Sequence, residues 1–211
     1  MQTEYLAKNL PEITDKIAKH GIAIVDQFLP SPTVDALAEE IRQLAQLNSL
    51  TAAGTGREKV AINTNLRGDH IYWLDEESTS PAQQSYFNVM ETLRLEFNRQ
   101  LYLGLFGLES HLALYPPGMT YQKHIDRFKG ENHGKPLRQI SAILYLNSQW
   151  QESNGGHLRL YLQEGDLGSA PYIDILPTAG KAVFFLSDTF YHEVLPPNQD
   201  RLSLTGWFLT R

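Results

Sequence analysis

The chain has 211 residues, a formal net charge of −6 at pH 7 and a hydrophobic content of 42%. This content is sufficient for one large folded domain, and the acidic balance argues against a nucleic-acid or membrane-surface binder, which usually carries a basic patch. The absence of cysteine excludes disulfides, zinc–thiolate sites and thiol catalysis. No apolar run has the length of a membrane span and no secretory signal is visible, so we expect a cytoplasmic protein.

The first half of the chain predicts helices around one strand. Residues 11–19 are predicted to form the first helix, with Pro11 at its first position. Residues 21–26 read as a buried strand. Ser31, followed by proline, predicts a capped helix start, and Ser80, also followed by proline, predicts another. These helices would support a later, β-rich part of the chain.

A polar segment separates these helices. Residues 48–65 contain two glycines and match no regular pattern, and their length is typical of a functional lid or a disordered loop. We therefore expect a single domain, 1–211. Within it, residues 1–105 would form the helical and strand support with a lid at 48–70, and residues 108–211 the catalytic core.

From Leu112 onward, short strands alternate with turns rich in Gly, Pro, Asn and Asp. Helices followed by strands are typical of an α+β domain in which helices buttress a double-stranded β-helix, or jelly roll. We predict this fold class.

Two histidines and one aspartate indicate a metal site. In a strand, residues two apart share a face, so His124 and Asp126 can converge on one ion while Ile125 turns into the core. His192 would come from another strand. Two imidazoles and one carboxylate can hold Fe(II) on one face and leave positions open for a substrate and O2. For the His-x-Asp pair in isolation, a surface histidine beside a solvated aspartate is the alternative.

Residues 201–209 alternate like a half-buried strand. Leu202 and Leu204 would lie on one face, with Arg201 on the other. A buried arginine needs a partner, and its planar guanidinium can pair with a carboxylate through two hydrogen bonds. The polar face therefore indicates a pocket that takes an acidic ligand.

Several motifs in order give a resemblance to a known family. The chain resembles the 2-oxoglutarate- and Fe(II)-dependent dioxygenases. It is most similar to the prolyl-hydroxylase branch that includes the hypoxia-inducible-factor type and its bacterial relatives. The matching pieces are residues 67–73, Tyr115 to Gly118, His124 to Asp126, Arg138 with 143–147, 155–160, 184–188, 192–194, and Arg201 with Trp207.

The resemblance implies roles for the core residues. His124, Asp126 and His192 would ligate Fe(II). Arg201 would bind the distal carboxylate of 2-oxoglutarate, and the hydroxyl of Tyr145 would bond the same group. An intact carboxylate at Asp126 favours hydroxylation over halogenation, because the halogenating relatives lack a carboxylate there.

The resemblance also implies residues around this core. Tyr115 would line the metal end of the pocket, although a core aromatic before a Pro-Pro turn is an equal alternative. Ser203 could donate to the co-substrate, or make only a local bond. Asp69 and Arg138 match a family ion pair that positions the substrate loop. The expected substrate-binding residues are Asp69, Arg138, Arg67 and Trp207.

The function implied is 4-hydroxylation of a proline in a protein or peptide. It would be coupled to decarboxylation of 2-oxoglutarate to succinate and CO2, with O2 consumed and ascorbate as the reductant. One alternative is the same chemistry on a small molecule such as a free amino acid. Another is a non-catalytic jelly-roll sensor of metal or 2-oxoglutarate.

Other ionisable residues are interpreted as structural. We expect His111 and His70 to support the strands beside them and His157 to lie on a strand surface. Asp188 is a rival metal ligand by its distance from His192, but we expect it to hold its own loop.

Overall fold

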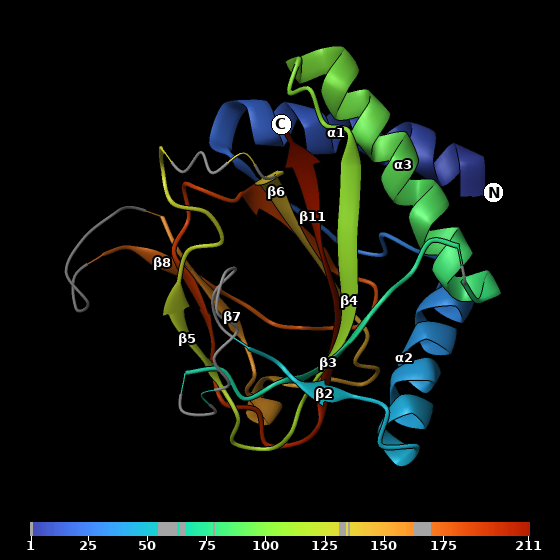
Figure 1. Cartoon of the computed structure of the whole chain (residues 1–211), viewed down its shortest axis with the longest axis vertical. Helices are drawn as coiled ribbons and strands as arrows, with labels where there is room; N and C mark the ends of the chain where they lie inside the picture. Colours follow the sequence, from blue (N-terminus) through green and yellow to red (C-terminus); the bar gives the residue numbers. More distant parts are fainter. Residues whose placement is uncertain are drawn as a thin grey trace.

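The protein is described by a computed structural model over residues 2–54, 63, 66–77, 79–130, 134, 136–162 and 170–211. In this part of the chain, helices gather on one side of two β-sheets (Figure 1). The elements in order are α1 (Gln2–His20), β1 (Ile22–Val25), α2 (Ser31–Gln46), β2 (Thr51–Ala52), β3 (His70–Trp73), α3 (Pro81–Leu101), β4 (Gly107–Tyr115), β5 (Tyr121–His124), β6 (Leu137–Tyr145), the 3-10 helix η1 (Glu152–Asn154), β7 (Leu158–Tyr161), β8 (Tyr172–Ile175), β9 (Ala182–Leu186), β10 (His192–Val194) and β11 (Arg201–Thr210).

The strands form a large and a small sheet, and the named strands pair antiparallel throughout. The large sheet has the order β1-β9-β6-β11-β4-β3-β2, and the small sheet has the order β5-β10-β7-β8. Because neighbours in each sheet come from distant parts of the sequence, the chain passes back and forth between the sheets, as in a jelly roll. The predicted α+β class with a jelly-roll core is confirmed.

The large sheet buries both of its faces, and the alternation of β11 shows how. Leu202 and Leu204 pack into the cluster that includes α1, α2 and α3. Arg201 and Ser203 are buried on the other face, towards the small sheet, where Leu158 of β7 is also buried. The predicted two-faced strand is confirmed, and the polar face lies between the two sheets.

Helix starts were predicted with mixed success. Ser80 caps α3, because its side chain accepts a hydrogen bond from the backbone N–H of Gln83 at 3.1 Å. The predicted cap at Ser31 is wrong: α2 already begins there, and its N-cap, Pro30, makes no side-chain bond.

The start of the first helix was also predicted wrongly. The helix begins at Gln2, so Pro11 lies inside it. An internal proline removes one backbone bond and clashes with the preceding turn. Leu10 and Ile13, on either side of it, are both buried in the helix-side core. Their burial offsets the cost of the proline.

Two more predictions about support elements are settled in part. Residues 22–25 form the expected strand, but only Ala23 in it is fully buried. Much of the predicted lid lies outside the described residues; within it, β2 pairs with β3. No helix among the described residues is both long enough and apolar enough to cross a membrane.

Candidate active site

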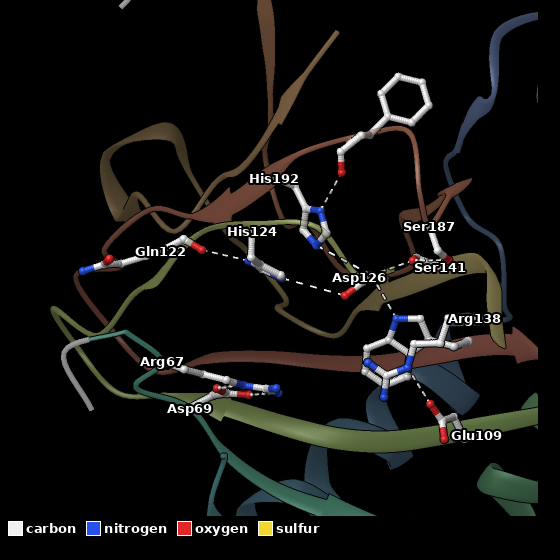
Figure 2. Close-up of polar contacts among 12 residues, drawn as sticks. Arg67, Asp69, Glu109, Gln122, His124, Asp126, Arg138, Ser141, Ser187 and His192 are labelled. Carbon is white, nitrogen blue, oxygen red and sulfur yellow. Dashed lines mark hydrogen bonds and ion pairs between the residues drawn. The ribbon is translucent and has the colours of Figure 1, made fainter. Parts of the chain in front are cut away.

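Two histidines and one aspartate meet where the strands of the small sheet end. His192, the first residue of β10, pairs directly with His124, the last residue of β5, and their ring centroids lie 4.1 Å apart. Asp126 follows β5, with its carboxylate oxygens 3.8 Å from His124 Nε2 and 3.7 Å from His192 Nε2. The potential ligand atoms of all three residues lie within 4.8 Å of one another. Figure 2 shows the three side chains converging.

This geometry differs in one respect from the sequence expectation. The strand ends at His124, so Asp126 projects from the bend beyond it rather than from the strand itself. Ile125 is half-buried and belongs to neither apolar cluster. The predicted convergence of the two side chains is nevertheless observed.

Both imidazoles are oriented by backbone carbonyls. His124 Nδ1 lies 2.8 Å from the carbonyl of Gln122, and His192 Nδ1 lies 3.1 Å from the carbonyl of Phe190. A carbonyl can only accept, so each Nδ1 carries a proton and each Nε2 is turned towards the centre. Burial, and next the proximity of His192, lower the pKa of His124 to about 3. His124 is therefore neutral at pH 7, as a metal ligand must be.

The carboxylate of Asp126 is held by two donors. The hydroxyl of Ser141 donates to Oδ2 at 2.6 Å, and the indole N–H of Trp207 donates to the same oxygen at 2.9 Å. Burial alone would raise the pKa of Asp126, but the nearby His192 and His124, then Arg138 and the bond from Ser141, outweigh it and keep the pKa below its usual value. Asp126 is therefore an anion, and the three residues offer the two imidazole nitrogens and one charged oxygen of a facial Fe(II) site.

Arg201 lines the inner end of the same pocket, and the fully buried Tyr145 lies behind it rather than in the pocket lining. Arg201 is 1% exposed, and its Nε donates to the carbonyl of Gly156 at 2.7 Å. Its guanidinium lies 5.1 Å from the ring centroids of both Tyr115 and Tyr145. Among the described residues, no carboxylate pairs with it. A buried guanidinium without a counter-ion is costly, which indicates that an anionic ligand completes this end of the pocket.

The hydroxyl of Tyr145 supports the same conclusion. It is buried and has no hydrogen-bond partner in the described part of the chain. Burial raises the pKa of Tyr145 to about 12, against the opposing effect of Arg201, so the hydroxyl keeps its proton and can donate. An unmet donor beside an unpaired guanidinium fits a carboxylate.

A glycine makes room for the arginine. Gly156 has φ 68°, a conformation that side chains rarely adopt, and a Cβ there would lie 3.1 Å from Cδ of Arg201. Gly156, within the matching piece 155–160, thus allows the backbone to approach the guanidinium and accept its hydrogen bond.

The predicted ion pair between Asp69 and Arg138 is wrong. Asp69 pairs with Arg67, not with Arg138: the distances are 2.7 Å from Nε to Oδ1 and 2.9 Å from Nη2 to Oδ2. The two residues share one short segment, whereas β6, which carries Arg138, is separated from β3 by β11 and β4. Figure 2 shows the pair beneath the metal cluster.

Arg138 pairs with a different acid. Its Nε donates to Glu109 at 2.6 Å, and its guanidinium stacks 3.6 Å above the centre of the Trp207 ring. The same indole donates its N–H to Asp126. By stacking on the ring, Arg138 therefore fixes the group that orients the carboxylate. Trp207, predicted to bind substrate, therefore lines the pocket and also holds Asp126.

The pocket includes residues that the sequence analysis missed. His111, interpreted as structural, lines the pocket and is 1% exposed, and its Nδ1 has no partner in the described residues. Burial, and next the charges of Arg67 and Arg138, hold the pKa of His111 well below its usual value. The sequence contained a signal for this. His111, Ala113 and Tyr115 alternate along one strand and therefore share its inner face. The remaining missed pocket residues are Tyr121, Ile143, Leu158, Val194 and Thr205.

The rival ligand is excluded by its contacts. Asp188 forms an ion pair with Arg127, so it holds the loop after β9, as expected. His157, predicted to lie on a strand surface, is half-buried and lies 3.0 Å from Glu152.

Known proteins with similar sequences and folds agree with this site. The 2OG-Fe(II) oxygenase superfamily matches residues 110–209. A solved prolyl-4-hydroxylase from Pseudomonas putida is 41% identical, with a TM-score of 0.84, and the match covers 95% of this chain and 99% of that one. A prolyl hydroxylase from Trichoplax adhaerens, solved with a peptide of hypoxia inducible factor, is 25% identical, with a TM-score of 0.85 over 99% of this chain and 92% of that one.

A curated human relative is matched over part of its length. Egl nine homolog 1 from Homo sapiens is 30% identical over 200 residues, which are 90% of this chain and 44% of the human protein. The chain spans about half the length of the curated relatives that it matches first. The nearly complete match to the Pseudomonas putida protein, together with the pocket geometry, establishes the family. The chain belongs to the 2OG-Fe(II) oxygenase superfamily, in the branch of the prolyl hydroxylases.

Proposed function

We propose that this protein is an Fe(II)- and 2-oxoglutarate-dependent dioxygenase that 4-hydroxylates a proline in a peptide or protein. One observation carries the proposal. A cluster of two imidazoles and one carboxylate shares a pocket with a buried arginine that has no carboxylate partner among the described residues. A metal site alone would not need the arginine, and an anion site alone would not need the cluster.

In this proposal the ligands of Fe(II) are His124, Asp126 and His192. Fe(II) and 2-oxoglutarate, when bound with O2, supply the oxidising chemistry that turns 2-oxoglutarate into succinate and CO2 and a substrate C–H bond into C–OH. One carboxylate among three ligands leaves a divalent ion with a net positive charge, which attracts the anionic co-substrate. The bonds to Gln122 and Phe190 hold both rings in place before any ligand arrives.

The inner end of the pocket would bind the distal carboxylate of 2-oxoglutarate. Arg201 is fixed by its bond to Gly156 and by the flanking tyrosine rings, so little side-chain freedom is lost on binding. Tyr145 would donate its unmet hydroxyl to the same carboxylate. Tyr115 and Ser203 would line the space between this end and the metal.

Apolar side chains would keep water from the reacting groups. Ile143, Leu158 and Val194 contribute to the wall of the pocket, and all three are buried. A water-poor site strengthens the attraction between Arg201 and a carboxylate and limits side reactions.

The peptide assignment rests on the mouth of the pocket and on the family branch. Arg67 and Asp69 form a two-bonded pair at this mouth, and Arg67 also lies 4.7 Å above the Tyr121 ring. Because Asp69 is buried, the pair holds the Arg67 side chain in a fixed position on the pocket wall before any peptide binds. Arg138 and Trp207 would act with it by fixing the opposite wall. The Trichoplax adhaerens relative, solved with a peptide, supports this reading.

The same proposal includes conditions for the reaction. Ascorbate would be the reductant, and the cytoplasm, which supplies 2-oxoglutarate, would be the compartment. The partner would be a proline-containing peptide or protein and not a nucleic acid.

Hydroxylated peptides provide the test. The purified protein, Fe(II), 2-oxoglutarate and ascorbate are incubated under air with peptides from a cell lysate, beside His124→Ala. Mass spectrometry should find proline peptides that gain one oxygen only with the active protein, and hydrolysis should yield 4-hydroxyproline. Oxygen gain only on free amino acids or other small molecules would replace the peptide assignment. The 3-hydroxy isomer would correct the position.

A matched pair of variants tests the mouth. Asp69→Asn weakens the pair with Arg67 without changing its shape, and it should reduce peptide hydroxylation more than succinate formation without peptide. Asp174→Asn weakens an equally two-bonded pair with Arg159, on the small sheet and outside the pocket lining. It should change neither rate. Equal losses of both rates in Asp69→Asn would refute the mouth assignment.

A further inference from the structure

Three aromatic rings form a triangular cluster beside the metal ligands. Their centroids lie 5.0 Å apart between Trp73 and His111, 5.3 Å between His111 and Trp207, and 6.3 Å between the two tryptophans. Aromatic rings at these separations are in contact. The cluster follows from the register of the large sheet, where Trp73 on β3 lies opposite His111 on β4, and Trp207 lies on β11, the next strand.

The two tryptophans of this cluster lie in different environments. The indole of Trp207 is bonded to Asp126 and is 4% exposed. Trp73 is 50% exposed. The direct contact between the two tryptophans therefore connects a proposed metal ligand to the protein surface. Tryptophan is also one of the few side chains that can give up one electron, so the cluster suits electron transfer as well as packing.

Turnover without a peptide creates a need for electrons. One atom of O2 is incorporated into succinate as 2-oxoglutarate loses CO2, and the other atom requires two electrons and two protons to leave as water. We propose, on the basis of the proposed function, that Trp207 and Trp73 conduct these electrons to the metal site. They would pass one at a time from a one-electron donor in solvent such as ascorbate. The sum is 2-oxoglutarate, O2 and ascorbate to succinate, CO2, water and dehydroascorbate.

Two charges near Trp207 act in opposite directions. The guanidinium of Arg138 lies 3.6 Å from the ring centre and opposes oxidation of the indole, whereas the carboxylate of Asp126 accepts the indole N–H at 2.9 Å and favours it. The direction therefore comes from exposure. Trp73 is 50% exposed and has no cation over its ring among the described residues, so a dissolved reductant can fill an electron hole that passes to it from Trp207.

Tyr121 is the competing route. Its ring stacks on His124 with centroids 3.6 Å apart, so it also contacts a proposed ligand. The ring is only partly buried and carries the guanidinium of Arg67 4.7 Å from its centre, a positive charge that opposes its oxidation. Oxygen added to Tyr121 rather than to Trp207 would identify this route.

Conservative variants of the outer residue test the path. Trp73→Phe keeps a ring but cannot be oxidised readily, whereas Trp73→Tyr keeps both a ring and the ability to give an electron. Tyr72→Phe is the matched control, because Tyr72 is 40% exposed on the same strand but points to the opposite face. Each protein is loaded with Fe(II) and given 2-oxoglutarate, O2 and ascorbate without peptide. Peptide mapping then counts oxygen atoms added to Trp207 for each succinate formed.

Trp73→Phe should raise oxidation of Trp207 severalfold and lower the ascorbate consumed for each succinate. Trp73→Tyr should restore both values, and Tyr72→Phe should match the wild type. The path is refuted if Trp73→Phe changes neither value, if Trp73→Tyr behaves like Trp73→Phe, or if the added oxygen is found on Tyr121 instead.

A second oxidant separates this inference from the proposed function. Hydrogen peroxide added to the Fe(II)-loaded protein without 2-oxoglutarate generates oxidant at the metal, and His124→Ala removes that metal. The same pattern across the Trp73 variants, absent in His124→Ala, supports the path even in a preparation that makes no succinate. Equal oxidation of Trp207 in all Trp73 variants under peroxide overturns it, whatever the succinate result.

Discussion

The two ends of the pocket are built on opposite plans. At the metal end, protein groups orient the side chains: backbone carbonyls hold His124 and His192, and Ser141 and Trp207 hold Asp126. At the inner end, the buried Arg201 has no carboxylate partner among the described residues, and the buried hydroxyl of Tyr145 has no hydrogen-bond partner there. The metal end is therefore prepared before binding, whereas the inner end is completed by its ligand. Changes at the two ends should have different signatures.

The largest effect is expected from a metal ligand. His124→Ala removes one of three ligand atoms. Loss of a residue that only hydrogen-bonds a ligand weakens metal binding by up to about 100-fold, so loss of a ligand itself should weaken it by more than about 100-fold. Titration with Mn(II), a redox-stable substitute for Fe(II), measures it. His157→Ala is the control, since His157 lies outside the cluster and pairs with Glu152. Equal metal affinity in both variants would remove His124 from the metal end.

At the inner end, Arg201→Lys should affect the co-substrate instead. Lysine keeps the charge but loses the two-pronged contact, and Arg201→Ala loses both. We expect Arg201→Ala to cost about 2 to 4 kcal/mol of 2-oxoglutarate binding, roughly 30- to 1,000-fold, with the lysine variant in between. Calorimetric titration of the Mn(II)-loaded proteins measures this. Metal affinity should stay near the wild-type value, and an equal loss of both affinities would contradict the separation of the two ends.

A smaller effect is expected where the metal end is merely supported. Ser141→Ala removes one of two donors to Asp126 and should weaken metal binding by about 10- to 100-fold. Ser187→Ala is matched to it, because Ser187 bonds the Ser141 hydroxyl at 2.9 Å without touching the carboxylate. Mn(II) titration of both should show the larger loss in Ser141→Ala. The reverse order would show that the serine pair serves packing rather than Asp126.

The smallest effect has opposite signs in two measurements. Tyr145→Phe removes a buried hydroxyl without a partner, so the melting temperature of the ligand-free protein should stay the same or rise. The same change should weaken 2-oxoglutarate binding by about 1 kcal/mol, roughly fivefold. Thermal unfolding with and without 2-oxoglutarate records both. A lower melting temperature without ligand would mean that the hydroxyl already has a partner.

Local patterns predicted which face a residue occupies. The alternation around Leu202 and Leu204 correctly turned Arg201 inward, and the spacing of His124 and Asp126 correctly predicted their convergence. The first signal depends on side-chain direction along one strand, which sequence periodicity reports directly. The second was right in its outcome but not in its reason, because Asp126 projects from the bend after β5.

Partners across strands were not predictable in the same way. Asp69 was assigned to Arg138, but the register of the large sheet separates them, and Arg67 lies nearer. His111 was interpreted as structural. Its side-chain direction follows from strand alternation, but its place in the pocket lining depends on β11 and the metal cluster, which lie beside it only in the folded chain. The start of α1 depended on how Leu10 packs, which outweighed a local proline signal. In each case the deciding interaction was non-local.

Succinate formation tests most directly the claim that both ends act on one co-substrate. The purified protein is given Fe(II), ascorbate and 2-oxoglutarate under air, with and without lysate peptides, beside His124→Ala and Arg201→Lys. The account predicts succinate from the wild type, none above background from His124→Ala, and recovery of the Arg201→Lys rate at high 2-oxoglutarate. Equal succinate from wild type and His124→Ala would contradict it. So would the absence of succinate under every condition, with no metal-dependent binding of 2-oxoglutarate.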